Sequence, residues 1–161
     1  MKRPRSHART AARRAALAAA VVGAVLCARD AAAVQPTCSV SVASAIAFGA
    51  YDPFSTVPLD TTGTITLQHC SQTPVTIAIG PGRSGSFSSR AMRGPGGDLL
   101  RYDLYLDAAR SIVWGDGAPG TSTWASASPS DRTIAVYARA FAAQDVSVGA
   151  YDDTITVTIN Y

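Results

Sequence analysis

The chain has 161 residues, 47% of them hydrophobic, and a formal net charge of +3. Its basic residues crowd the first 33 positions, and the 128 residues after them hold seven arginines against ten aspartates, with no lysine and no glutamate. That remainder carries a net charge of −3 and is long enough for one domain with a sizeable core. The overall pI of 9.0 is therefore no sign of nucleic-acid binding, and no nucleic-acid partner is expected.

The N-terminus reads as an export signal. A basic stretch precedes the apolar run 15–26, which is too short to span a bilayer comfortably, and Ala31, Ala32 and Ala33 supply small residues for cleavage. The run has no polar face, unlike an ordinary amphipathic helix, and Leu26 is too large for lipoprotein processing at Cys27. We expect residues 1–33 to be a cleaved helical signal peptide, residues 34–161 to form the single domain, and no membrane span to remain.

Two cysteines, Cys38 and Cys70, remain after the leader. In an exported protein the simple interpretation is one disulfide, which would stabilise the fold by about 3–4 kcal/mol. The alternative is that the two cysteines bind a metal, but further ligands are lacking because His69 is the one histidine after residue 33. We therefore expect no metal and no other cofactor.

Short hydrophobic runs separated by turn-rich segments follow along the chain. The first three lie at 38–48, 64–68 and 75–79, with a break at 49–58. Residues 80–97 hold six glycines and predict a long loop or a ragged sheet edge. Residues 100–107 are the clearest central strand, 112–114 is a short run before a turn, 118–130 reads as a loop and 134–141 as the penultimate strand. No convincing helix appears after the leader, so the pattern predicts an antiparallel β-sandwich.

The last eight residues alternate strictly between hydrophobic and polar side chains, as a half-buried strand does. Such a strand is either central or an edge that something else must cover. It follows a second copy of the sequence Gly-Ala-Tyr-Asp, found at 49–52 and again at 149–152, which we interpret as a reused turn because the flanking residues differ.

Residues for catalysis are scarce, so we expect no enzyme. A Ser–His–Asp site would have to use His69, which we expect to be a structural or surface histidine. Asp152 and Asp153 are adjacent and favour a turn or capping role over a calcium site. The turn 115–117 beside Trp114 suits a plain hairpin better than a sugar site.

Several short motifs occur in a characteristic order over the whole domain. They are Cys38 with Val40 and Val42, Phe48-Gly49-x-Tyr51-x-Pro53, Gly63-x-Ile65-x-Leu67-x-x-Cys70, Arg90-x-Met92, Leu100-x-Tyr102-x-Leu104-Tyr105-x-Asp107, Trp114-Gly115-Asp116-Gly117, Val136-Tyr137-x-Arg139 and Gly149-x-Tyr151-x-Asp153-Thr154-x-x-Val157-Thr158-x-x-Tyr161. In this order the chain resembles the spore coat protein U domain, which includes the Csu-type pilins of archaic chaperone–usher systems.

The resemblance implies an incomplete immunoglobulin-like β-sandwich that lacks its last strand. A periplasmic chaperone would fill the resulting groove first, and a neighbouring pilin's N-terminal extension would replace it at an outer-membrane usher. The groove walls would be the first and last strands, with Val40, Val42, Ile46, Phe48, Ile155, Val157, Ile159 and Tyr161. Composition alone fits a closed core equally well.

The segment before Cys38 is shorter than the N-terminal extension that the resemblance implies. Only four residues, 34–37, would precede Cys38, and Pro36 has no backbone N–H to donate to a neighbouring strand. A donor strand needs about ten alternating residues. We therefore expect a subunit that accepts a strand and cannot donate one, as at a tip or terminus.

The sequence thus predicts an exported, non-enzymatic subunit of a surface fibre, used in adhesion or biofilm formation. It would pass through the periplasm to the cell surface. The alternative is a self-complete secreted sandwich that acts as a coat or binds carbohydrate through loops 80–97 and 114–124.

Overall fold

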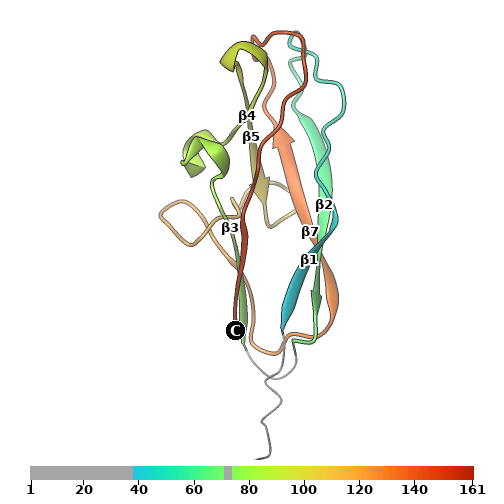
Figure 1. Ribbon diagram of the computed structural model, residues 1–161, viewed down its shortest axis with the longest axis vertical. Helices are drawn as coiled ribbons and strands as arrows, with labels where there is room; N and C mark the ends of the chain where they lie inside the picture. Colours follow the sequence, from blue (N-terminus) through green and yellow to red (C-terminus); the bar gives the residue numbers. More distant parts are fainter. Residues whose placement is uncertain (1–37, 71–73) are drawn as a thin grey trace, which may run out of the picture. The chain divides into compact units, whose positions relative to one another are not determined.

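Threonine, valine and isoleucine alternate in the strands of this chain, and such side chains suit a pleated surface with one buried face. The computed structural model describes residues 38–70 and 74–161 (Figure 1). The predicted signal peptide, its cleavage site and residues 34–37 lie outside the described residues. The strands are β1 (Ser39–Ser44), β2 (Leu59–Gln68), β3 (Val75–Ile79), β4 (Ala91–Arg93), β5 (Leu99–Tyr105), β6 (Trp124–Ser126), β7 (Arg132–Ala140) and β8 (Val157–Asn160).

These strands form two antiparallel sheets. One has the order β1-β2-β7-β5-β4, and the other has the order β6-β3-β8. The longest pairing joins β2 to β7, from Leu59 opposite Ala140 to Leu67 opposite Arg132. Residues of both sheets share one hydrophobic core, so the predicted antiparallel β-sandwich is confirmed.

The structure differs from the sequence-based boundaries at strand ends and in the loops. The predicted strand over the last eight residues is a strand only at Val157–Asn160, because residues 154–156 pair with neither sheet, and the first run 38–48 is a strand only at Ser39–Ser44. The predicted loops 80–97 and 118–130 contain the short strands β4 and β6, because Met92 pairs with Leu100 and Trp124 pairs with Ile77. The run 112–114 makes isolated bridges only. The described residues contain three short 3-10 turns, η1 (Gly82–Ser84), η2 (Phe87–Ser89) and η3 (Pro95–Gly97), and no α-helix.

The core lies between the two sheets. Ile65 and Leu67 of β2 and Ile77 and Ile79 of β3 are buried there, beside the fully buried Trp114. The Trp114 Nε1–H donates to the carbonyl of Ile77 at 2.9 Å, which ties the 112–114 segment to the three-stranded sheet.

Within the predicted strand at 100–107, residues 102–105 are all buried, although their sequence alternates between apolar and polar side chains, whereas Arg101 is exposed. Asp103 is expected to face water, yet it is only 8% exposed. The side chain of Arg90 covers it, with its Nη1 2.6 Å from the Asp103 carboxylate. This pair fastens the segment before β4 to β5.

Candidate functional site

One side of the sandwich, between β1 and the C-terminal segment, is open. Among the described residues no strand pairs with the outer edge of β1 or of β8. Two adjoining cavities, of about 310 Å³ and about 620 Å³, lie along this side. They share Ile46, Phe48, Met92 and Tyr151, so we treat them as one groove and use that name below.

The first wall of the groove is β1 with the residues that follow it. β1 pairs only with β2, and its register shifts between Val42 and Ser44. Val42 lies on the core side of β1 and yet is 62% exposed, because no strand covers it from the opposite sheet. Ile46 comes next and packs directly over Gly63, where a Cβ would lie only 2.7 Å from its Cγ1. The wall is therefore apolar and accessible.

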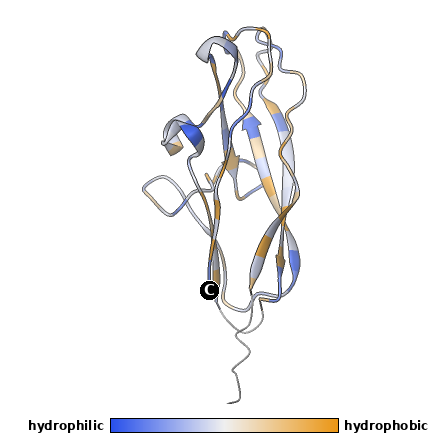
Figure 2. Cartoon of the chain, viewed as in Figure 1, coloured by the Kyte–Doolittle hydropathy of each residue, from blue (hydrophilic) through white to orange (hydrophobic). Residues whose placement is uncertain are grey.

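The second wall is the segment from Gly149 to β8. Near its start, Asp152 exchanges backbone hydrogen bonds with Arg93, the last residue of β4, at 2.8 and 3.1 Å. At its other end Val157 and Ile159 pair with Ile79 and Ile77 of β3. The segment thus crosses from one sheet to the other along the groove. Figure 2 shows hydrophobic residues along it and along β1.

Asp153 anchors the middle of this second wall. Its Oδ2 accepts the Tyr102 hydroxyl at 2.8 Å, and its Oδ1 accepts the backbone N–H groups of Arg83 at 2.9 Å and Thr154 at 2.7 Å. Asp152 pairs with the Arg83 guanidinium at 2.6 Å on the exposed side. Burial, and after it the bond to Asp153, raises the pKa of Tyr102 well above its ordinary value, so its hydroxyl keeps the proton it donates.

The floor of the groove is the hydrophobic core itself. The smaller cavity reaches down to buried side chains of four strands, which are Ile65, Ile79, Tyr102, Leu104 and Val136. A strand lying in the groove would bury these side chains further and would meet the free edges of β1 and β8. The arrangement can therefore bind an extended peptide through both its backbone and its side chains.

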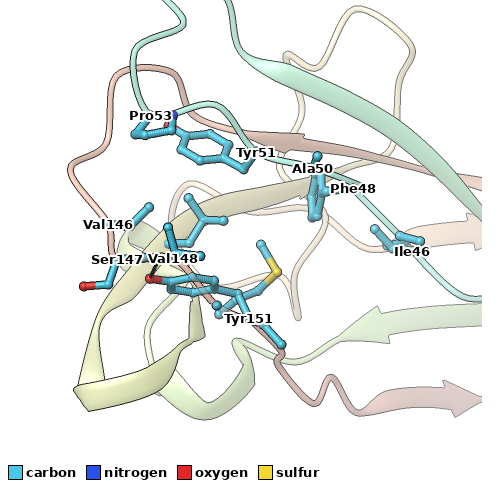
Figure 3. A pocket seen from close by; sticks show the side chains of 15 residues that line it. Ile46, Phe48, Ala50, Tyr51, Pro53, Val146, Ser147, Val148 and Tyr151 are labelled. Atoms are coloured by element: carbon cyan, nitrogen blue, oxygen red, sulfur yellow. Dashed lines mark hydrogen bonds between the residues drawn. The ribbon is translucent and has the colours of Figure 1, made fainter.

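The larger cavity brings the two Gly-Ala-Tyr-Asp copies together (Figure 3). The Tyr51 hydroxyl donates to the carbonyl of Phe141 at 2.8 Å, and the Tyr151 hydroxyl donates to that of Ser147 at 2.8 Å. Both tyrosines thus hold the loop 141–148. The interpretation of one reused turn is wrong, because Gly49 has a left-handed φ of 77° and Gly149 does not.

The structure brings most of the predicted wall residues to the groove. Val42, Ile46, Phe48, Ile155 and Val157 line it. Val40 and Ile159 are partly buried against the core and do not line either cavity. Tyr161 is 60% exposed and also lies outside both cavities.

Sequence reasoning missed Met92, Tyr151 and Asp153 as lining residues. Tyr151 carried a usable signal, since it belongs to the second Gly-Ala-Tyr-Asp copy. Met92 lay in a segment predicted as a loop. Asp153 was missed because no local sequence pattern shows that its segment crosses from one sheet to the other.

The predicted disulfide is confirmed. Cys38 is bonded to Cys70, and it joins the start of β1 to the end of β2 next to the pairing of Ser39 with Gln68. The bond therefore fixes the lower end of the first groove wall.

The residues considered for other chemistry are placed elsewhere. His69 is exposed, with a left-handed φ of 59°, and its backbone N–H donates to Asp131 at 2.7 Å. Trp114 is fully buried and so cannot meet a sugar. Within residues 38–70 and 74–161 there is no group of three or more metal-ligating side chains, and no helix there is long and apolar enough to cross a membrane.

Comparison with known proteins gives the family. The spore coat protein U domain matches residues 23–158, which is most of the chain. The chain belongs to the spore coat protein U domain family. A curated relative in Myxococcus xanthus, named Protein U, is 32% identical over 126 residues, covering 71% of this chain and 70% of the relative.

A solved structure has the same fold as this family member. It is the pre-assembly complex of the CsuC chaperone and the CsuE tip adhesion subunit from the archaic chaperone–usher Csu pili of Acinetobacter baumannii. The TM-score is 0.53 at 23% identity, and the match covers 80% of this chain. This chain spans only 40% of the solved one.

Proposed function

We propose that this chain is an exported structural subunit of a surface fibre and is assembled by donor-strand complementation. The open apolar groove between β1 and the C-terminal segment carries the proposal, because two free strand edges flank it. A periplasmic chaperone would occupy the groove first, and a strand from a sibling pilin would replace it at an outer-membrane usher. The chaperone–subunit complex with the same fold supports these partners.

The physical reason is the cost of leaving the groove empty. Free backbone edges next to apolar surface recruit other strands and aggregate. The second wall runs from Gly149 to Val157, so a strand of about nine residues matches its length. Such a strand would place alternate side chains in the groove.

The test uses the exported, processed protein refolded with and without a synthetic peptide. The peptide has nine residues, with valine at every inward position and polar residues between. We expect the protein alone to aggregate and the peptide to give a soluble, cooperatively folding complex. A scrambled peptide of equal composition is the control. A soluble, stable protein that does not bind the peptide would contradict the proposal and support a self-complete coat or carbohydrate-binding module.

We also propose that the subunit accepts a strand without donating one, as a tip or terminal subunit would. This rests on the expected start at Val34, four residues before Cys38. Mass spectrometry of the mature N-terminus tests it. A start well before residue 25 would leave room for a donor strand and would exclude the terminal role.

A role in adhesion or biofilm formation is supported by apolar residues at one pole of the sandwich. Phe54 is 91% exposed, Val148 is fully exposed and Val57 is largely exposed. The loops that carry them are adjacent, since the Ala143 N–H donates to the Ser55 carbonyl at 3.0 Å. Exposed apolar residues gathered in this way are typical of a contact surface.

A further inference from the structure

The smaller cavity contains one polar position that is made by two hydrogen-bonded side chains among mostly apolar residues. Tyr102 on the floor donates its hydroxyl hydrogen to Asp153 on the second wall, and Tyr151, Ile155 and Val157 of that wall line the same cavity. Ile46 and Phe48 of the first wall also line it, together with the small polar residues Ser44 and Thr64. Both charged residues that line the two cavities, Asp152 and Asp153, are acidic, and no lysine or arginine lines either cavity.

This position can only accept hydrogen bonds. Asp153 Oδ1 already accepts two backbone N–H groups, and Oδ2 accepts the Tyr102 hydroxyl. A carboxylate oxygen offers about two acceptor sites, so Oδ2 keeps one of them. The Tyr102 oxygen has given its only hydrogen to Asp153 and can accept as well.

We propose that this position recognises a hydroxyl side chain near the middle of the incoming strand and thereby sets the register of that strand. The proposal rests on the proposed function and adds the chemistry of the partner. A threonine or serine there donates to Asp153 or Tyr102, whereas valine leaves those acceptors unpaired. An aspartate there meets a carboxylate and is excluded.

The apolar residues on either side of this position would fix the register of the incoming strand. A slip of two residues would move the hydroxyl against Ile155 or Tyr151, where burying it without a partner is unfavourable. A correctly placed hydroxyl therefore favours one alignment among several that valine side chains alone would allow.

The test is a threonine scan of the same nine-residue peptide. Each of its five inward valines is replaced by threonine in turn, and the affinity for the refolded, processed chain is measured by fluorescence anisotropy. We expect threonine to weaken binding about fivefold or more at four positions and to preserve or strengthen it at one central position. Weaker binding at all five positions would overturn this inference and leave the proposed function standing. No binding of the all-valine peptide would overturn both.

Two variants separate recognition from structural support. In Asp153→Ala we expect the advantage of central threonine over valine to disappear, whatever the change in affinity for the peptide with valine at all five inward positions. In Arg83→Ala, which loses the exposed contact with Asp152 and keeps Asp153, we expect the advantage to remain. Equal losses for every peptide in Asp153→Ala would show that Asp153 only supports the wall and would overturn the inference. If Asp153→Ala does not fold, the threonine scan on the unaltered chain decides whether a central hydroxyl is recognised.

Discussion

A single buried arginine connects distant parts of this fold. Arg90 is fully enclosed, and its guanidinium donates to Asp103 at 2.6 Å, to the Gly80 carbonyl at 2.9 Å and to the Trp114 carbonyl at 3.1 Å. Burial raises the pKa of Asp103, while the Leu104 N–H and the positive charge of Arg90 favour its ionised form. The pair joins β5 to the end of β3 and so maintains the floor of the groove.

Replacing Arg90 with methionine should lower the free energy of unfolding by about 3–5 kcal/mol, because the buried Asp103 is left without a positive charge beside it. Chemical denaturation of the peptide-bound protein measures this. The double variant Arg90→Met with Asp103→Leu is the matched control and should recover much of the loss, since no charge remains unpaired. A double variant no more stable than Arg90→Met would contradict this account.

β1 is a weakly supported strand of the groove. It pairs with β2 alone, and four of its six residues in a row, 41–44, are exposed. The disulfide of Cys38 with Cys70 fixes the residue just before β1, and the register with β2 shifts after Val42. An element held in this way can adjust to different incoming strands.

Replacing both cysteines with serine should lower the free energy of unfolding by about 3–4 kcal/mol through the loss of the cross-link. Hydrogen exchange should show protection lost first in β1, with β2 and β7 retained, because those two strands pair along their whole length. In the peptide-bound protein, the same substitutions should reduce the hydrogen-exchange protection of β1 by a smaller amount. A uniform loss of protection over all strands would exclude a specific role of the disulfide at this wall.

At the scale of the whole molecule, the groove and the apolar pole adjoin each other, since Val148 of the pole also lines the larger cavity. In our proposal the groove binds a strand through backbone edges and core side chains. The pole, formed by loops 52–57 and 141–148, carries exposed apolar side chains. The tyrosines of both Gly-Ala-Tyr-Asp copies line the larger cavity and donate hydrogen bonds to the loop 141–148 of the pole.

Replacing Phe54 and Val57 with serine should reduce retention of the peptide-bound protein on a hydrophobic surface about tenfold or more, since burying each side chain is worth about 1.5–3 kcal/mol. The melting temperature should stay unchanged because both side chains are exposed. Ile112→Ser, on a different loop and 46% exposed, is the matched control. An equal loss of retention in this control would argue against a dedicated surface at the pole.

The sequence by itself determined the longer strands, the sandwich and the disulfide, but not the short strands β4 and β6. Alternation of side chains along a strand is a local pattern, and the two cysteines after residue 33 leave one simple pairing. It also indicated two segments as the walls of a groove, and five of the eight residues named for them, Val42, Ile46, Phe48, Ile155 and Val157, line the smaller cavity; their role as acceptor walls stays a prediction. Only the tertiary structure decided that the groove is open, that Asp153 and Tyr102 place a polar position within it, and that both Gly-Ala-Tyr-Asp copies meet at one cavity. Those features depend on contacts between residues far apart in the chain, such as Tyr102 with Asp153 and Arg93 with Asp152, and no local pattern encodes such contacts.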